Sequence, residues 1–167
     1  MDSKFKFVEI KNLSNELIDK YSNTIFNQFH YLINFPELNH SIENIIKLFK
    51  EPSFYGLFII YENKKIGYII GSDKILDDTR NIYYIDYIYI SKEYRHNHLG
   101  SYLMNIIEDR VKKLKMDGVM LICDTENLFV NDFYLRKGYY PDNHLRRFAR
   151  NDVMYKSFTG NNFITLS

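Results

Sequence analysis

The chain has 167 residues, with 22 Lys and Arg against 21 Asp and Glu, and its one cysteine is Cys123. A chain of this length forms one compact domain that buries roughly 70% of its unfolded surface, so its core needs neither disulfides nor a structural metal. The lone cysteine excludes a disulfide framework and favours a reducing compartment. The net charge of +1 argues against general nucleic-acid binding, because affinity for phosphate requires a concentrated positive field.

Residue usage is strongly biased, since a single alanine, Ala149, 3 Pro and 7 Gly stand beside 15 Tyr and 13 Phe. This bias is typical of an A/T-rich genome, such as that of a microbe or a large virus. No apolar run reaches the roughly 18 residues that cross a bilayer, and the first six residues lack the apolar stretch of a signal sequence. We therefore expect a soluble, cytoplasmic protein without a membrane or nucleic-acid partner.

The first half of the chain alternates strand and helix patterns. A helical stripe recurs at i, i+3, i+4 and i+7 in Ile42, Ile45, Ile46 and Phe49. The polar turn at 62–64 lies between two apolar runs rich in β-branched and aromatic residues, which indicates a hairpin. The expected elements are a strand over 5–10, a helix over 13–35 that breaks before Pro36, a helix over 41–50, and a hairpin of strands over 54–61 and 65–72.

The second half begins with a polar stretch at 73–81 and contains the most regular patterns. Gly118 follows a long amphipathic helix as a C-terminal cap would, and Gly138 closes a shorter helix. The expected elements are a strand over 82–90, a loop over 91–98, a helix over 99–114, a strand over 119–123, a helix over 127–137 and a strand over 149–158. This order predicts one mixed α/β domain over residues 1–160 and a short tail over 161–167.

The segment Tyr94–Ser101 joins the strongest strand to the longest helix. A helix N-terminus presents unpaired backbone N–H groups and the positive end of the helix dipole, which together bind anions. Gly100 permits close backbone approach and Ser101 adds a hydroxyl donor. Every strand–loop–helix connection has such an end, however, so phosphate binding does not follow from this segment alone.

Two motifs here resemble those of the GNAT superfamily, the acetyl-CoA-dependent N-acetyltransferases. In its first motif a strand is followed by Arg or Gln, two residues, Gly, one residue, and Gly or Ala opening a helix. Arg95, Leu99 and Gly100 match this pattern, whereas His98 occupies the place of the first Gly. Residues 127–139 resemble the second motif, with an Asn, an aromatic-Tyr pair and a basic-Gly-aromatic close. The spacing over residues 84–139 is most similar to that of diamine and polyamine N-acetyltransferases.

The resemblance implies a GNAT-like fold, with a mixed, mostly antiparallel, twisted sheet of about six or seven strands flanked by about four helices. It also implies acetyl-CoA as the acyl donor, with no metal. The backbone of the loop and helix start would hold the pyrophosphate, the backbone of the preceding strand would hold the pantetheine arm, and one Asn side chain would contact the cofactor. By position these residues are His96, Asn97, His98, Leu99, Gly100 and Ser101, after Arg95 of the motif, then Ile88, Tyr89 and Ile90, and finally Asn127.

Two residues are the expected catalytic groups. An alkylamine is almost fully protonated at neutral pH, so acetyl transfer needs a group that accepts a proton. Asp86 is the only acid in an apolar strand, and it falls where the resembled diamine enzymes carry their strand acid; the alternative is a solvated or ion-paired aspartate. Tyr134 falls where the family keeps the tyrosine that protonates the departing thiolate; the alternative is an ordinary core tyrosine. Capping of a helix is the alternative role for Asn127.

Other candidate sites are weaker. Cys123 is expected in the core, since no motif places a base beside it. His96 and His98 lack the clustered acids or cysteines of a metal site. The basic residues Arg146, Arg147 and Arg150 are expected in a solvated turn, with a phosphate of CoA or an acidic partner as the alternative.

The sequence thus predicts an N-acetyltransferase that acts by direct attack in a ternary complex on a primary amine, led by small polyamines or alkylamines. A protein N-terminus or lysine is the alternative acceptor, and a GNAT-like binding module without activity is the alternative class, suggested by His98. A homodimer is compatible with the resemblance. The choice of acceptor depends on residues 1–80, which carry no motif.

Overall fold

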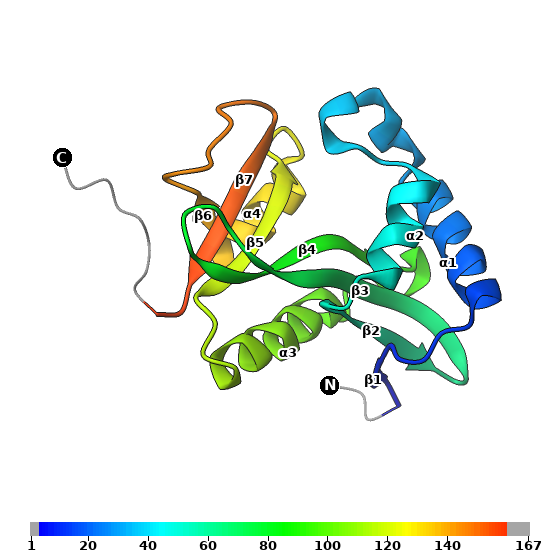
Figure 1. Ribbon diagram of the computed structural model, residues 1–167. Helices are drawn as coiled ribbons and strands as arrows, with labels where there is room; N and C mark the ends of the chain where they lie inside the picture. Colours follow the sequence, from blue (N-terminus) through cyan, green and yellow to red (C-terminus); the bar gives the residue numbers. More distant parts are fainter. Residues whose placement is uncertain (1–3, 160–167) are drawn as a thin grey trace.

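A computed structural model describes residues 4–159 of the chain, which form one seven-stranded sheet with helices on both faces (Figure 1). The strand order is β1-β2-β3-β4-β5-β7-β6, and within these residues only the β4–β5 pair is parallel. The strands are β1 (Lys6–Glu9), β2 (Phe54–Tyr61), β3 (Lys64–Ile75), β4 (Asn81–Ile90), β5 (Gly118–Asp124), β6 (Tyr140–Pro141) and β7 (Asn151–Ser157). The α-helices are α1 (Asn15–Gln28), α2 (Ile42–Lys50), α3 (Leu99–Lys113) and α4 (Leu128–Arg136). The predicted fold class is confirmed.

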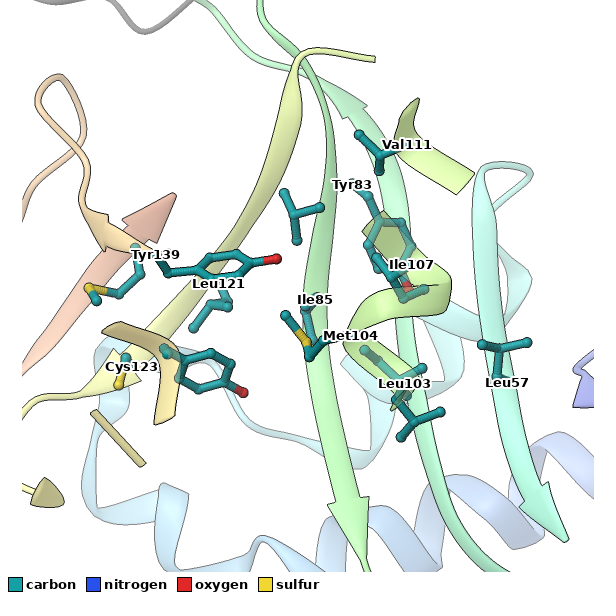
Figure 2. Close-up of a cluster of buried hydrophobic side chains, with 14 of the residues drawn as sticks. Leu57, Tyr83, Ile85, Leu103, Met104, Ile107, Val111, Leu121, Cys123 and Tyr139 are labelled. Atoms are coloured by element: carbon teal, nitrogen blue, oxygen red, sulfur yellow. The ribbon is translucent and has the colours of Figure 1, made fainter. Parts of the chain in front are cut away.

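The two faces of the sheet carry separate cores. Helices α1 and α2 bury Ile18, Ile25 and Ile45 against Tyr68 and Ile70 of β3. On the opposite face, α3 and α4 pack over the middle strands (Figure 2). There Leu103, Met104, Ile107 and Val111 of α3 meet Leu57, Tyr83, Ile85 and Leu121 of the sheet. The amphipathic stripe predicted for residues 99–114 is therefore the main contact of α3 with the sheet.

Four sequence expectations need correction. The helix predicted over 13–35 ends at Gln28 and continues as 3-10 turns η1 (His30–Asn34) and η2 (Pro36–Leu38). Gly118 is the first residue of β5 rather than a helix cap, since Lys115 takes the left-handed conformation at φ 57°. The hairpin turn uses Glu62 and Asn63, both at positive φ, so β3 begins at Lys64. At its other end β3 continues past the predicted residue 72 to Ile75, paired with β4. The short strand β6 was not predicted, because two residues carry no periodicity.

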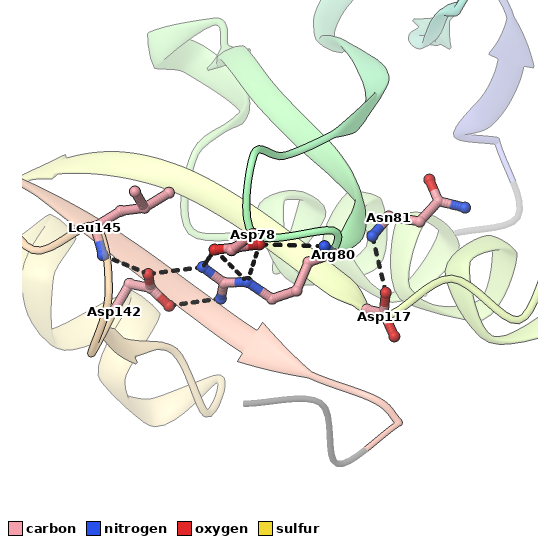
Figure 3. A network of polar contacts seen from close by, with 6 residues as sticks. All are labelled: Asp78, Arg80, Asn81, Asp117, Asp142 and Leu145. Carbon is pink, nitrogen blue, oxygen red and sulfur yellow. Dashed lines mark hydrogen bonds and ion pairs between the residues drawn. The ribbon is translucent and has the colours of Figure 1, made fainter. Parts of the chain in front are cut away.

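A buried ionic network joins the loop before β4 to the loop between β6 and β7 (Figure 3). The guanidinium of Arg80 is fully buried and donates two hydrogen bonds to Asp142, of 2.7 and 2.9 Å. It also donates to Asp78 at 2.8 Å. Asp142 in turn accepts a 2.8 Å bond from the backbone N–H of Leu145. The network therefore fixes the start of the 142–150 loop.

Within residues 4–159, no helix combines the length and the apolar composition needed to traverse a bilayer. The predicted domain end at residue 160 and the tail at 161–167 lie outside the described residues.

Candidate active site

Strands β4 and β5 separate halfway along β4. Their parallel pairing covers only Ile82–Ile85 against Gly118–Leu121. Strand β4 continues to Ile90, paired on its other edge with β3. From Asp86 onward, the edge of β4 that faces β5 therefore has no partner strand among the described residues, which leaves backbone groups available to an extended ligand.

A β-bulge lies where the two strands separate. Ile70 of β3 is opposite Tyr87 and Gly71 is opposite Ile85, so Asp86 is the extra residue of β4. A bulge bends its strand and redirects the side chains around it. The close approach at Gly71, where a Cβ would lie 2.0 Å from the carbonyl oxygen of Tyr84, shows why glycine faces this bulge.

The carboxylate of Asp86 is largely buried, and its Oδ2 atom has no hydrogen-bond partner among the described residues. Burial raises the pKa of Asp86 to about 6, against a smaller opposing effect of the charge of Lys74. A carboxylate with this pKa is mostly ionised at neutral pH and can accept a proton. Asp86 is thus a largely buried carboxylate with a raised pKa rather than a paired surface acid.

Tyr134 lies on α4, buried between Phe133 and Tyr139, with ring centroids 5.1 and 5.9 Å away. Burial raises the pKa of the Tyr134 hydroxyl, assisted by Cys123 and by Tyr31 of η1. The hydroxyl therefore keeps its proton throughout the neutral range. The segment between α1 and α2 reaches the start of β7, where Glu37 of η2 accepts a 3.1 Å hydrogen bond from the side chain of Asn151.

The loop from β4 to α3 has the geometry of an anion site. His96 and His98 adopt left-handed backbone, at φ 69° and 60°, so His98 takes the conformation that the missing glycine would favour. The side chains of Arg95 and Asn97 hold the loop, since Arg95 donates to the carbonyl of Ile90 at 2.8 Å and Asn97 donates to that of Tyr94 at 2.9 Å.

The first helical N–H groups, of Leu99, Gly100 and Ser101, lack acceptors within the helix, as at any helix start. The open edge of β4 at Ile88, Tyr89 and Ile90 precedes them in the chain, so one ligand that spans both regions could use the backbone of each. These residues fit a ligand that combines a phosphate with an extended amide chain, as CoA does.

Two other predicted residues serve the structure directly. Asn127 caps α4, its side chain accepting from the N–H of Val130 at 3.3 Å. Cys123 is buried, its Sγ lies 3.9 Å from Oδ1 of Asn131, and burial raises its pKa to about 11. A thiol with this pKa is protonated at neutral pH, so it makes a poor nucleophile.

Sequence reasoning missed the residues that enclose the site from the α1–α2 side. His40 Nδ1 lies 2.7 Å from the hydroxyl of Tyr87, and its Nε2 lies 3.1 Å from the carbonyl oxygen of Phe26. The His40 ring also stacks on Phe26 at 4.9 Å, while Tyr87 packs on Phe29 at 5.1 Å. These contacts join segments 47 residues apart, and no local pattern signals them.

The basic residues of the 142–150 loop divide into two kinds. Arg146 pairs with Asp152 at 3.1 Å and Arg150 pairs with Asp124 at 2.9 Å. The side chain of Arg147 has no ion-pair partner within residues 4–159, and only its backbone N–H is bonded, to Asp152 at 2.7 Å. The predicted basic cluster is therefore mostly neutralised.

Comparison with solved structures finds the same fold in proteins of low sequence identity. Arabidopsis thaliana NAA60 in complex with acetyl-CoA has a TM-score of 0.68 at 14% identity, over 93% of this chain and 99% of that chain. An acetyltransferase of the GNAT family from Staphylococcus aureus Mu50 has a TM-score of 0.62 at 16% identity, over 92% and 98%. An aminoglycoside acetyltransferase from an uncultured soil metagenomic sample, in complex with trehalose, has a TM-score of 0.61 at 19% identity, over 81% and 88%.

Comparison with curated proteins finds no match. The sequence profile of the acetyltransferase (GNAT) family, by contrast, matches residues 16–139. This match covers most of the chain and includes the bulge of β4, the loop before α3 and helix α4. The chain therefore belongs to the GNAT family of acetyl-CoA-dependent acetyltransferases.

Proposed function

We propose that this acetyltransferase acts on a primary amine, by direct attack of the amine on the acetyl donor in a ternary complex. The observation that carries the proposal is Asp86, a largely buried carboxylate with an unpartnered oxygen at the point where β4 leaves β5. A primary amine is mostly protonated at neutral pH and must lose a proton before it can attack. A buried acid with a pKa of about 6 is suited to accept that proton.

Acetyl-CoA supplies an activated acetyl group when bound along the open edge of β4. The amine nitrogen forms its bond to the acetyl carbon while the bond from that carbon to sulfur breaks. Asp86 accepts the proton lost by the amine, directly or through one water. The hydroxyl of Tyr134, which burial keeps protonated, donates a proton to the departing sulfur.

The backbone geometry supports the proposed binding roles. The N–H groups over residues 96–101 would hold the pyrophosphate, and the main chain of Ile88, Tyr89 and Ile90 would pair with the pantetheine arm as an added strand does. Asn127 already caps α4, and its contact with the cofactor would be additional. The left-handed conformation of His98 supports this arrangement, because the departure from the family motif leaves the backbone path intact.

Identifying the acceptor requires a panel of amines. The local resemblance to diamine and polyamine N-acetyltransferases supports small polyamines and alkylamines, and a peptide N-terminus and a peptidyl lysine are the further classes. Release of the CoA thiol should be measured with each acceptor for the wild type, Asp86→Asn and Tyr134→Phe. Tyr140→Phe is the matched control, because Tyr140 is an exposed tyrosine of β6.

We expect Asp86→Asn to lower kcat/KM for the best amine by about 10²-fold or more, as loss of a general base does. Tyr134→Phe should lower kcat, and Tyr140→Phe should match the wild type. All variants should bind acetyl-CoA like the wild type in calorimetry. Equal rates for all four proteins would refute the assigned roles, and absence of thiol release with every amine would refute the amine acceptor.

A further inference from the structure

The bulge of β4 places two consecutive side chains on the same face of the sheet. Ile85 and Ile88 both pack in the core cluster beneath α3. Asp86 follows Ile85 in the strand, so the alternation of side chains directs it to the opposite face. Tyr87 packs on that opposite face as well, in the cluster beneath α1 and α2. A regular strand would separate these two side chains, whereas the bulge sets Asp86 and Tyr87 side by side.

The hydroxyl of Tyr87 is hydrogen-bonded to His40, which lies just before α2. His40 Nδ1 is 2.7 Å from the hydroxyl oxygen, and His40 Nε2 is 3.1 Å from the carbonyl oxygen of Phe26. A carbonyl oxygen can only accept, so Nε2 carries the ring proton and Nδ1 is the acceptor of the neutral ring. The Tyr87 hydroxyl therefore donates its proton to His40.

Aromatic packing holds both rings of this pair in place. The His40 ring stacks on Phe26 with the two planes 7° apart, and the Tyr87 ring packs on Phe29 with centroids 5.1 Å apart. Burial, and after it the charge of Asp86, raises the pKa of the Tyr87 hydroxyl, so the hydroxyl keeps the proton that it donates. The Tyr87 oxygen therefore offers lone pairs, and no proton, to a ligand beside Asp86.

An amine bound at Asp86 would meet this oxygen. The side chain of a tyrosine is longer than that of an aspartate by about the length of one hydrogen bond. A nitrogen that donates to the Asp86 carboxylate would therefore come level with the Tyr87 hydroxyl. The Oδ2 atom of Asp86 has no partner among the described residues, and the Tyr87 proton is directed to His40. Both oxygens can thus accept from one nitrogen, and a primary amine has the two N–H groups that this needs.

We propose that the acceptor nitrogen is held between the Asp86 carboxylate and the Tyr87 hydroxyl oxygen, and that His40 is a positioning residue that keeps the Tyr87 proton out of the site. The proposal rests on the amine acetyltransferase function proposed above and adds a binding residue to its acceptor site. Two acceptors orient the nitrogen more strictly than one does, which leaves its lone pair free to attack the acetyl carbon. The segment between α1 and α2 thus acts on the acceptor through Tyr87.

Steady-state kinetics with n-butylamine test the pair. We expect Tyr87→Phe to raise KM for the amine about tenfold, as loss of one hydrogen bond does, and to leave KM for acetyl-CoA unchanged. His40→Phe, which keeps a ring on Phe26, should also raise KM for the amine, and the double variant should be no worse than Tyr87→Phe alone. His40→Asn returns an acceptor near the place of Nδ1 and should recover part of the loss. Tyr140→Phe and His144→Gln change exposed side chains and should match the wild type.

Two NMR measurements on the full chain do not require turnover. The ring nitrogen signals of His40 should show the proton on Nε2, and n-butylamine should shift the amide signals of Asp86 and Tyr87, with a Kd about tenfold higher in Tyr87→Phe. Such shifts without acetylation of any amine would refute the proposed function and leave the paired acceptors standing. A His40 proton on Nδ1, absence of the shifts, an unchanged KM in Tyr87→Phe, or additive losses in the double variant would overturn the inference.

Discussion

Asp86 combines features that an aspartate selected only for stability would lack: it lies in a bulge, its Oδ2 is unpartnered among the described residues, and burial raises its pKa to about 6. A general base acts in its ionised form. When KM is expressed as the concentration of unprotonated amine, kcat/KM should therefore rise with pH through about 6 and then reach a plateau. A pH–rate profile of thiol release, corrected for ionisation of the amine, checks this; an unchanged profile in Asp86→Asn would exclude Asp86 as the titrating group.

The same carboxylate should reduce the stability of the fold. The folded protein holds the Asp86 proton more tightly than the unfolded chain does, so ionisation of this group costs stability above about pH 6 and nothing below about pH 4. Asp86→Asn should accordingly raise the free energy of unfolding by up to about 3 kcal/mol at pH 7.5, since one pKa unit corresponds to about 1.4 kcal/mol. Urea unfolding at pH 7.5 and pH 4 measures the difference. If Asp86→Asn had a lower free energy of unfolding than the wild type at pH 7.5, ionised Asp86 would not be destabilising, and the prediction would be wrong.

At the level of single residues, sequence reasoning can single out a residue that contrasts with its surroundings. Asp86 is an acid in an apolar strand, and Tyr134 lies within a recognisable motif, so both stand out in the sequence alone. His40 does not, because its significance comes from contacts across the fold. With 15 Tyr in the chain, Tyr87 likewise had nothing to distinguish it.

At the scale of elements, the start of α3 depends on a left-handed residue that is not glycine. His98 adopts φ 60°, whereas a β-branched residue in this conformation would cost roughly 1–2 kcal/mol of stability. We expect His98→Val to lower the free energy of unfolding by about that amount and to weaken binding of acetyl-CoA, whereas His98→Gly keeps both near the wild type. Thermal unfolding and calorimetric titration measure the two effects. Equal behaviour of the two variants would show that the loop does not need this conformation.

Elements with a strong period were predictable, and those with mixed local signals were not. The stripe of α3 and the alternation of β4 follow from sequence, because burial on one face requires them. The end of α1 at Gln28 did not follow, since the apolar residues continue to Phe35 while the chain turns toward β7 through η1 and η2. The contact between Glu37 and Asn151 belongs to tertiary structure and leaves no local signal.

At the scale of the whole molecule, Arg80 links two loops that are 62 residues apart in the chain. A lysine offers one point charge and cannot replace a planar guanidinium that serves two buried aspartates. Arg80→Lys should lower the free energy of unfolding by at least about 2 kcal/mol, since a broken buried pair leaves charge uncompensated. The control is Arg136→Lys, in an exposed pair with Asp132, which should change stability by less than about 1 kcal/mol. Similar urea midpoints for the two variants would show that the network contributes little.

The separation of β4 from β5 also bears on how firmly the two parts of the sheet are joined. Within residues 4–159, strands β1–β4 and β5–β7 share only the pairing of Ile82–Ile85 with Gly118–Leu121. A donor lying along residues 86–90 would act as a clamp between these half-sheets, slowing hydrogen exchange of the Tyr87–Ile90 amides while those of β2 stay unchanged. At a donor concentration of 100 times Kd, linkage adds about 2.7 kcal/mol to folding. The resistance of this protein to unfolding, and hence to proteolysis, would then follow the supply of its own acetyl donor.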